Sequence, residues 1–243
     1  MPYRIFLAGA AGAIGGRMVL ILRDAGHTVV GTTRSAGKAE TLRSLGVEPV
    51  LVDVFDAELL LRAMEAAQPD VVIHQLTDLP KKLDPNRMGA AIVRNARIRE
   101  EGTQNLVAAA NTLRVRRLVA QSIGWAYAPG PEPHSESDPL DAGAQGDRGT
   151  TVRGVIALED CVLKSPPLAG LVLRYGRLYG PGTHADKPAN SAPVHVDAAA
   201  YAAVLAMDRG QPGTYNIAQP NAYMTTHKAR AELGWDPDFR ISD

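Results

Sequence analysis

Residues 3–16, YRIFLAGAAGAIGG, constrain the fold of this chain more than any other stretch. They open with a short apolar run at 5–7, which predicts a buried strand. A glycine-rich turn follows, and the residues after Gly12 have the apolar spacing of a helix up to residue 26. Strand, glycine turn and helix in this order predict a dinucleotide-binding unit. Its three glycines have the spacing GxxGxxG: Gly9, Gly12 and Gly15.

Each glycine has a physical role in such a unit. Gly9 can make the tight turn, Gly12 can let the backbone approach a pyrophosphate, and Gly15 can let the helix pack closely on the strand. The first helical residues, Ala13 and Ile14, would offer free N–H groups and the positive end of the helix dipole to phosphate. An ordinary glycine-rich turn between a strand and a helix is the alternative.

Composition excludes several classes of partner. The chain has 243 residues with 26 basic and 26 acidic side chains, so its net charge of zero gives no electrostatic reason to bind nucleic acid or an anionic membrane. The single cysteine, Cys161, cannot form an intrachain disulfide, and the six histidines lack the spacing of metal ligands. No apolar stretch is long enough to span a bilayer, and the N-terminus has the pattern of a strand instead of a signal peptide. We expect a cytoplasmic protein without a metal.

Strands and helices alternate along most of the chain. This order predicts an α/β fold with a Rossmann-type doubly wound parallel sheet. Further strands are expected at 27–33, 48–54, 70–75, 117–121, 170–174 and 213–218, and helices at 38–45, 57–68, 88–113, 151–164, 197–207 and 226–233. Loops are expected at 77–86 and 129–149.

The expected domain organisation is an NADP-binding Rossmann domain at 1–175 and a small, interleaved substrate-binding lobe at 176–243. Two segments of this lobe, 183–191 and 219–225, have little apolar periodicity. Active-site lids come from such weakly packed segments, so we expect both to order on substrate binding.

The end of the second strand indicates which dinucleotide binds. An NAD-preferring enzyme commonly carries a carboxylate there for the ribose 2′-hydroxyl, but residues 31–35 contain none. Arg34 can instead give a 2′-phosphate a bidentate contact, with Thr33, Ser35 and Lys38 as further donors. We therefore expect NADPH as the cofactor. A solvated basic loop is the alternative.

Further motifs extend from residue 9 to residue 235. They are GAAGAIG at 9–15, EGTQNLVAAA at 101–110, RYGRLYGPG at 174–182, HVD at 195–197, GTYNI at 213–217 and ELGW at 232–235. In this order they resemble the extended short-chain dehydrogenase/reductases, in the epimerase/dehydratase branch. The resemblance implies a nicotinamide dinucleotide and an oxidoreductase activity.

The resemblance also assigns residues to the cofactor. It places Asp53 and Val54 at the adenine edge, although a helix cap is an alternative role for Asp53. It places the remaining cofactor contacts at the carboxyl ends of later strands: Gln75, Leu76, Thr77, Gln121, Tyr175, Gly176 and Leu178.

Ser122 matches the catalytic serine or threonine of the resembling family. Its hydroxyl could donate a hydrogen bond to a substrate carbonyl and stabilise oxyanion charge, or it could satisfy local backbone. The residues after it are expected to bind substrate, with flat aromatic walls that could equally belong to the core: Ile123, Gly124, Trp125 and Tyr127. Arg99 lies where family members often carry asparagine, and it either reaches the active site or pairs with a surface carboxylate.

The chain departs from the family at the catalytic pair YxxxK. Thr151 and Val155 occupy the corresponding positions, and neither can replace an acidic phenol or an ammonium group. The resemblance is then to natural-product ketoreductases with an incomplete triad. The leading expectation is NADPH-dependent reduction of a ketone on a polycyclic aromatic polyketide, in a monomer or homodimer, with a substrate hydroxyl assisting. A catalytically inactive NADP(H)-binding sensor and a nucleotide-sugar epimerase/dehydratase are the alternatives.

Overall fold

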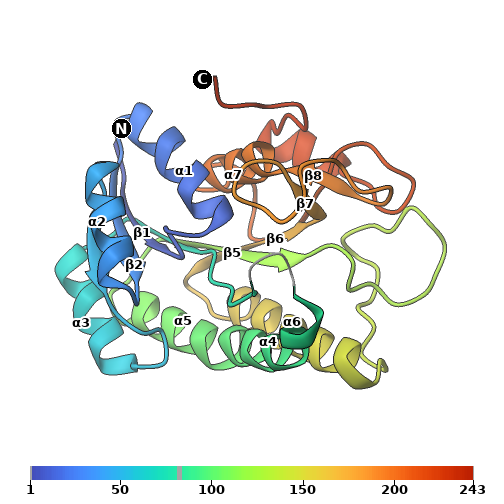
Figure 1. Cartoon of the computed structure of the whole chain (residues 1–243), viewed down its shortest axis with the longest axis horizontal. Helices are drawn as coiled ribbons and strands as arrows, with labels where there is room; N and C mark the ends of the chain where they lie inside the picture. Colours follow the sequence, from blue (N-terminus) through green and yellow to red (C-terminus); the bar gives the residue numbers. More distant parts are fainter. Residues whose placement is uncertain (1, 81–83, 243) are drawn as a thin grey trace.

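Seven parallel strands form the main sheet of the part that the computed structural model describes, residues 2–80 and 84–242 (Figure 1). Their order is β3-β2-β1-β4-β5-β6-β9, and every pair of neighbours is parallel. The strands are β1 (Arg4–Ala8), β2 (Thr28–Thr33), β3 (Glu48–Leu51), β4 (Val71–His74), β5 (Arg117–Ile123), β6 (Ala169–Tyr175) and β9 (Gly213–Ile217). The predicted Rossmann-type fold class is confirmed, because the strand order reverses between β1 and β4 as in a doubly wound sheet.

Helices cover both faces of this sheet. In Figure 1, α1 and α7 lie above the sheet, while α3, α4, α5 and α6 lie beneath it. The helices are α1 (Ala13–Asp24), α2 (Ala36–Ser44), α3 (Ala57–Ala67), α4 (Pro85–Arg97), α5 (Thr103–Thr112), α6 (Gly146–Leu163) and α7 (Val196–Leu205). Two π-helical turns, η2 (Ile98–Gly102) and η3 (Ala229–Leu233), complete the helical elements of the described residues.

The core has two main layers, one on each face of the sheet. Buried side chains of α1 and α7, such as Met18 and Val196, pack on one face with alternate residues of the strands. Leu60 of α3, Leu106 of α5 and Leu158 of α6 pack on the other face. Because side chains of a strand alternate between faces, each strand feeds both layers. No helix of the described residues is long and apolar enough to cross a membrane.

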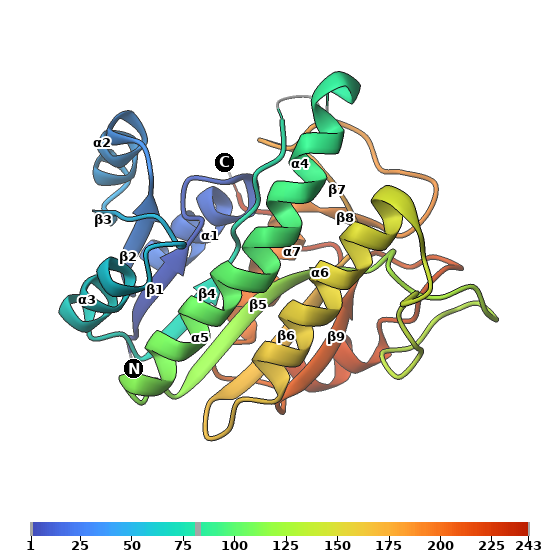
Figure 2. The same ribbon diagram turned by 90° about the horizontal axis from the view of Figure 1, so that it is seen from below.

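The long helix expected at 88–113 differs from the structure in two ways. It begins earlier, at Pro85, because the side chain of Asp84 accepts a hydrogen bond from the backbone N–H of Asn86 (3.0 Å). It is also interrupted, since η2 joins α4 to α5; Figure 2 shows this ribbon running beside α6. The loop expected at 77–86 includes residues 81–83, which lie outside the described residues.

Residues 176–243, the expected substrate-binding lobe, contribute a strand to the main sheet and a helix to one of the layers that cover it. β7 (Arg177–Tyr179) and β8 (Pro193–His195) form a separate two-stranded sheet, whereas β9 extends the main sheet beside β6. α7 packs on α1, where the guanidinium of Arg17 pairs with the carboxylate of Asp197. That this segment binds substrate stays a prediction.

The two expected lid segments are held differently. Residues 183–191 are irregular and mostly exposed. In 219–225, by contrast, the carbonyl of Tyr223 accepts from the backbone N–H of His134, and the N–H of Thr225 donates to the carbonyl of His134, both at 2.8 Å. The second segment is therefore anchored to the loop after β5. The helix expected at 226–233 is found at 227–233, and most of it is the π-helical turn η3.

Candidate cofactor pocket and active site

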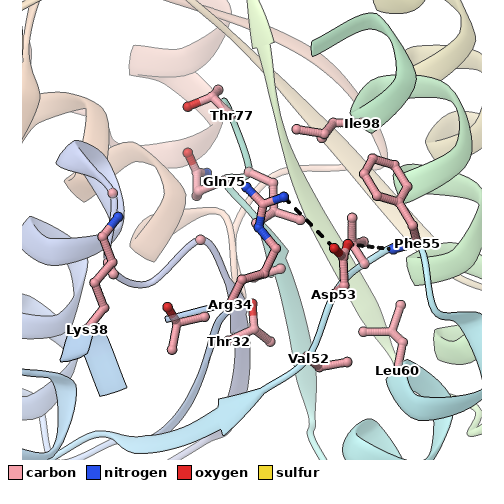
Figure 3. A pocket seen from close by; sticks show the side chains of 17 residues that line it. Thr32, Arg34, Lys38, Val52, Asp53, Phe55, Leu60, Gln75, Thr77 and Ile98 are labelled. Carbon is pink, nitrogen blue, oxygen red and sulfur yellow. Dashed lines mark hydrogen bonds and ion pairs between the residues drawn. The ribbon is translucent and has the colours of Figure 1, made fainter. Parts of the chain in front are cut away.

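A pocket lies at the carboxyl ends of β1, β2 and β4, where open parallel sheets bind ligands. Figure 3 shows its walls, which come from the glycine turn, the end of β2, the segment after β3 and the end of β4. Many of the predicted cofactor residues line it: Gly9, Gly12, Thr33, Arg34, Lys38, Asp53, Val54, Gln75, Leu76 and Thr77.

The glycine turn forms a cradle that no larger residue could form. Gly9 has a φ of +95°, and a Cβ there would lie 2.6 Å from the carbonyl oxygen of Gln75. The N–H of Gly12 donates to the carbonyl of Gly9 (3.0 Å), which closes the turn. A Cβ on Gly15 would collide with the same carbonyl, so the helix can approach the strand only with glycine there. α1 then begins at Ala13 and Ile14 with no side-chain cap on its free N–H groups.

The basic end of the pocket is built by β2 and α2. Ser35 caps α2 by accepting from the N–H of Lys38 (3.4 Å), and the hydroxyl of Thr33 accepts from the N–H of Ser35 (3.2 Å). The side chains of Arg34 and Lys38 both line the pocket, and Figure 3 shows Arg34 pointing toward Asp53. Both are cations that could bind a phosphate in the cavity.

Arg34 lies between two carboxylates. Its Nη1 is 3.9 Å from Oδ2 of Asp53, and its Nη2 is 3.6 Å from Oδ2 of Asp78. Asp53 also accepts from the N–H of Phe55 (3.1 Å), while the cap of α3 is Asp56. Asp53 is therefore a pocket residue and not the helix cap. The contact with Asp78 was not anticipated, because that residue follows β4 and nothing near it in the sequence indicates Arg34.

Gln75 is the clearest sign that this pocket receives a ligand. Its side chain is buried, its Nε2 faces the hydroxyl of Tyr175 at 3.5 Å, and its Oε1 has no hydrogen-bond partner among the described residues. Burial raises the pKa of the Tyr175 phenol, which keeps that group neutral. A buried acceptor without a donor is costly, so a ligand donor is expected beside it. The glycine cradle, the two cations and this acceptor together fit a dinucleotide.

The other predicted cofactor residues, toward the nicotinamide, lie outside this cavity. Tyr175 ends β6 in the core, and Gly176 lies so close to the carbonyl of Ala192 that no Cβ would fit. Leu178 on β7 is partly buried, and Gln121 is partly exposed on β5. Their contacts with a cofactor stay predictions.

Ser122, which we expected to donate a hydrogen bond to a substrate, is not among the residues that line this pocket. Its side chain is buried beneath β5, and its hydroxyl donates to Oε1 of Glu159 on α6 at 2.7 Å. Glu159 is held by Arg174 in a bidentate pair with distances of 3.0 and 2.7 Å. Because a serine has one proton to donate, Ser122 cannot also donate to a substrate carbonyl in this arrangement. We correct its assignment to a structural contact.

Tyr127 is also a core residue and not a substrate wall. It is 2% exposed, its hydroxyl donates to Oδ1 of Asn216 (2.6 Å), and its ring stacks on His134. Burial raises the pKa of this phenol. Gly124 is similarly structural, since a Cβ there would lie 2.7 Å from Cε of Met224.

Of the expected substrate residues, Trp125 remains a candidate, whereas Ile123 belongs to the core. Trp125 is partly exposed, and the guanidinium of Arg177 lies 5.9 Å from its ring centroid. Ile123 is buried against Val152 and Val155 of α6. The patch at the carboxyl end of β5 therefore combines one aromatic ring with one cation.

Helix α6 contains neither tyrosine nor lysine. Thr151 and Val155 are both buried on it, and Val155 has no exposed surface. No group of α6 at these positions can donate a proton with the acidity of a phenol. That Thr151 and Val155 correspond to the YxxxK pair of the family stays a prediction.

Comparison with known proteins identifies relatives of the chain. Residues 5–194 match the NAD dependent epimerase/dehydratase family. A 3-diazoavenalumate denitrifying reductase from Streptomyces sp is 40% identical over 260 residues, covering 96% of this chain and 83% of the relative.

Solved structures share the fold. A UDP-glucose 4-epimerase from Thermotoga maritima with UDP-glucose has a TM-score of 0.76 at 21% identity, covering 97% of this chain and 94% of that chain. A UDP-glucose 4-epimerase from Stenotrophomonas maltophila, with bound NAD and formylated UDP-arabinopyranose, has a TM-score of 0.78 at 18% identity, with coverages of 98% and 94%. At these identities the likeness concerns the fold alone.

Proposed function

Because the chain belongs to the NAD dependent epimerase/dehydratase family, we propose that it is an NADPH-dependent reductase of an aromatic ketone, of the polycyclic polyketide class. It is an oxidoreductase whose 40% identical relative is named a reductase. The observation that bears on the proton route is α6, which has no tyrosine or lysine to supply a proton.

The preference for NADPH rests on the basic end of the pocket. Arg34 and Lys38 can bind a 2′-phosphate, and no carboxylate at the end of β2 repels it. The two carboxylates beside Arg34 hold its guanidinium near the entrance at 3.6 and 3.9 Å. These ion pairs are exposed and weak, so a phosphate can displace them.

Ketone reduction consumes one hydride and one proton and yields a secondary alcohol. The reduced dinucleotide, when bound, supplies the hydride. The chain's own residues bind and orient the reactants, with the glycine cradle and Gln75 on the cofactor side and Trp125 on the substrate side. A hydroxyl of the substrate beside the carbonyl steadies the alkoxide by a hydrogen bond, and water supplies the proton. This arrangement needs no acid from α6.

A second candidate substrate is an aromatic diazo compound, which the name of the 40% identical relative favours. An aryldiazonium ion that accepts a hydride gives the arene and dinitrogen, so atoms and charge balance without any proton. The absence of tyrosine and lysine from α6 suits this reaction equally. The two candidate reactions use the same cofactor. Ketone reduction converts the C=O double bond to a single bond, whereas diazonium reduction breaks the bond between carbon and nitrogen.

An acceptor panel separates the candidates. NADPH oxidation is followed by absorbance with 8-hydroxy-1-tetralone and with 3-diazonio-4-hydroxybenzoate, and products are identified by mass. A ketone substrate gains two hydrogens, whereas a diazonium substrate loses dinitrogen and gains one hydrogen. Trp125→Ala tests the substrate side, and the expected result is a higher KM for the acceptor with unchanged NADPH affinity. An enzyme that binds NADPH but oxidises it with neither acceptor contradicts the proposal and favours the inactive sensor.

A further inference from the structure

Arg99 is not among the residues that line the pocket, and no contact described above involves its side chain. It lies in η2, the π-helical turn between α4 and α5, and π-helical turns inside helices often mark functional sites. Its side chain is partly buried, whereas those of its neighbours Arg94 and Arg97 are exposed. A partly buried guanidinium needs a physical reason.

The neighbouring arginines have acidic partners and Arg99 does not. Nε of Arg94 is 3.1 Å from Oδ2 of Asp78, and Nε of Arg97 is 2.6 Å from Oε2 of Glu101. Within residues 2–80 and 84–242, no carboxylate or other side chain forms a hydrogen bond or ion pair with Arg99. Burial lowers its pKa to about 10, and no acidic group counteracts this effect. The surface ion pair that the sequence left open is therefore absent from the described residues.

Contacts on both sides of Arg99 show which way this face of the helix points. Four residues earlier, Oδ1 of Asn95 accepts from the N–H of Asp78 (3.0 Å), in the segment after β4. Four residues later, the hydroxyl of Thr103 lies 3.1 Å from Nε2 of His74, the last residue of β4. Residues at this spacing share a helix face. Arg99 therefore faces the carboxyl end of β4, where the pocket residues Gln75 and Thr77 follow.

The lowered pKa of His74 agrees with a position of Arg99 near the end of β4. Burial, and to a smaller extent the nearby guanidinium of Arg99, lower the pKa of His74 to about 4. η2 also packs against α6, the helix with Thr151 and Val155 at the catalytic positions. The guanidinium of Arg99 thus adds a positive charge near the end of β4.

We infer that Arg99 binds an anionic oxygen of the aromatic substrate, a carboxylate on the ring that carries the reacting atom. Its planar guanidinium carries five N–H donors and matches an oxyanion in a bidentate geometry. The inference rests on the proposed function, because it names the substrate group that the same site recognises. It adds a specificity-determining residue on η2 to a site otherwise built from strand ends.

The test uses a matched pair of probes, salicylate and salicylamide. They have the same ring and hydroxyl and differ in the anionic oxygen. Their binding to the enzyme in the presence of NADP⁺ is measured by isothermal titration calorimetry, for the wild type and for Arg99→Met and Arg99→Lys. Arg87→Met is the control, since Arg87 is exposed in the first turn of α4, twelve residues before Arg99 along the same helix.

We expect the wild type and Arg87→Met to bind salicylate at least about tenfold more tightly than salicylamide, the scale of one charge-assisted hydrogen bond. Arg99→Met should lose this preference with salicylamide binding unchanged, and Arg99→Lys should retain part of it. A wild type without the preference, or an Arg99→Met variant that keeps it, overturns the inference. An Arg99→Met variant with tenfold weaker NADP⁺ binding also overturns it, because the guanidinium would then serve the cofactor.

Two readouts keep this inference separate from the proposed function. Circular dichroism shows whether each variant folds, and Arg99→Gln replaces Arg99→Met in the same comparison if the latter does not. If the wild type reduces neither acceptor of the panel while salicylate binding depends on Arg99, the proposed function fails and the anion site stands. If the wild type reduces an acceptor while salicylate binding does not depend on Arg99, the proposed function stands and the anion site fails.

Discussion

Arg174→Met should destabilise the fold strongly, because it leaves the carboxylate of Glu159 buried without its cation. The two side chains are 6% and 7% exposed and share two hydrogen bonds of 2.7 and 3.0 Å. Burial disfavours the charged form of Arg174, yet the hydrogen bonds and the charge of Glu159, together with Tyr127, outweigh burial and raise the pKa of Arg174. After the substitution, only the hydroxyl of Ser122 still donates to Glu159.

Removing one partner of a buried ion pair typically costs about 3–5 kcal/mol of the free energy of unfolding. For a chain of this length, that loss corresponds to a fall in Tm of about 10 °C. The assay is urea denaturation followed by circular dichroism. The doubly substituted chain, with Glu159→Met added, should be more stable than Arg174→Met alone, since neither charge is then buried.

The control for this prediction is Arg62→Met. Arg62 pairs with Glu58 on the exposed surface of α3, so its loss should change Tm by little. An Arg174→Met variant within about 1 kcal/mol of the wild type would show that the ion pair does not stabilise the core in this way. Water or a rearranged donor would then satisfy Glu159 in place of the guanidinium.

Three further predictions concern the cofactor, pH and the lid. Wild type should bind NADPH at least about tenfold (~1.4 kcal/mol) more tightly than NADH by fluorescence titration, and Arg34→Asp should erase the difference; a wild type that prefers NADH contradicts it. His74 has a folded-state pKa of about 4 against an ordinary 6.5, so its contribution to stability is present above pH 6.5 and is lost as the pH falls toward 4. At about 1.36 kcal/mol per pKa unit, this contribution is about 3 kcal/mol. The urea stability of His74→Gln should therefore fall less between pH 6.5 and pH 4 than that of the wild type, and an equal fall would contradict this prediction. Residues 183–191 should exchange amide hydrogens quickly in the free enzyme and slowly with cofactor and substrate bound, whereas Tyr223 and Thr225 should be protected in both states; uniform protection of 183–191 would count against a lid.

Local geometry made the glycine turn beside the pocket predictable from the sequence. Gly9, Gly12 and Gly15 belong to one strand–turn–helix unit, and their roles follow from the space that a Cβ would need. The alternation of strands and helices likewise predicted the layers, because each helix must bury one face on the sheet. These features depend on residues that are close in the chain.

The substrate half was less predictable because its contacts join distant segments. Ser122 resembles a catalytic serine, but its partner Glu159 lies 37 residues away on α6. Tyr127 resembles a pocket wall, but its hydroxyl meets Asn216, 89 residues further on. A sequence pattern cannot indicate which face of the sheet each side chain meets when the partner comes from a remote strand or helix. Arg99 illustrates the same limit, since only the structure shows that no carboxylate of the described residues pairs with it.

Hydride transfer without a proton from the protein is the feature that would set this reductase apart from enzymes with a tyrosine and a lysine on the equivalent helix. It can be measured by comparing kcat for 8-hydroxy-1-tetralone and its methyl ether, 8-methoxy-1-tetralone, with NADPH saturating and the affinity of each acceptor measured separately. We predict that the methyl ether binds but turns over at least about 100-fold more slowly, the lower range of general acid catalysis. Equal turnover of the two ketones would contradict the proposed proton route, because the proton would then come through the protein.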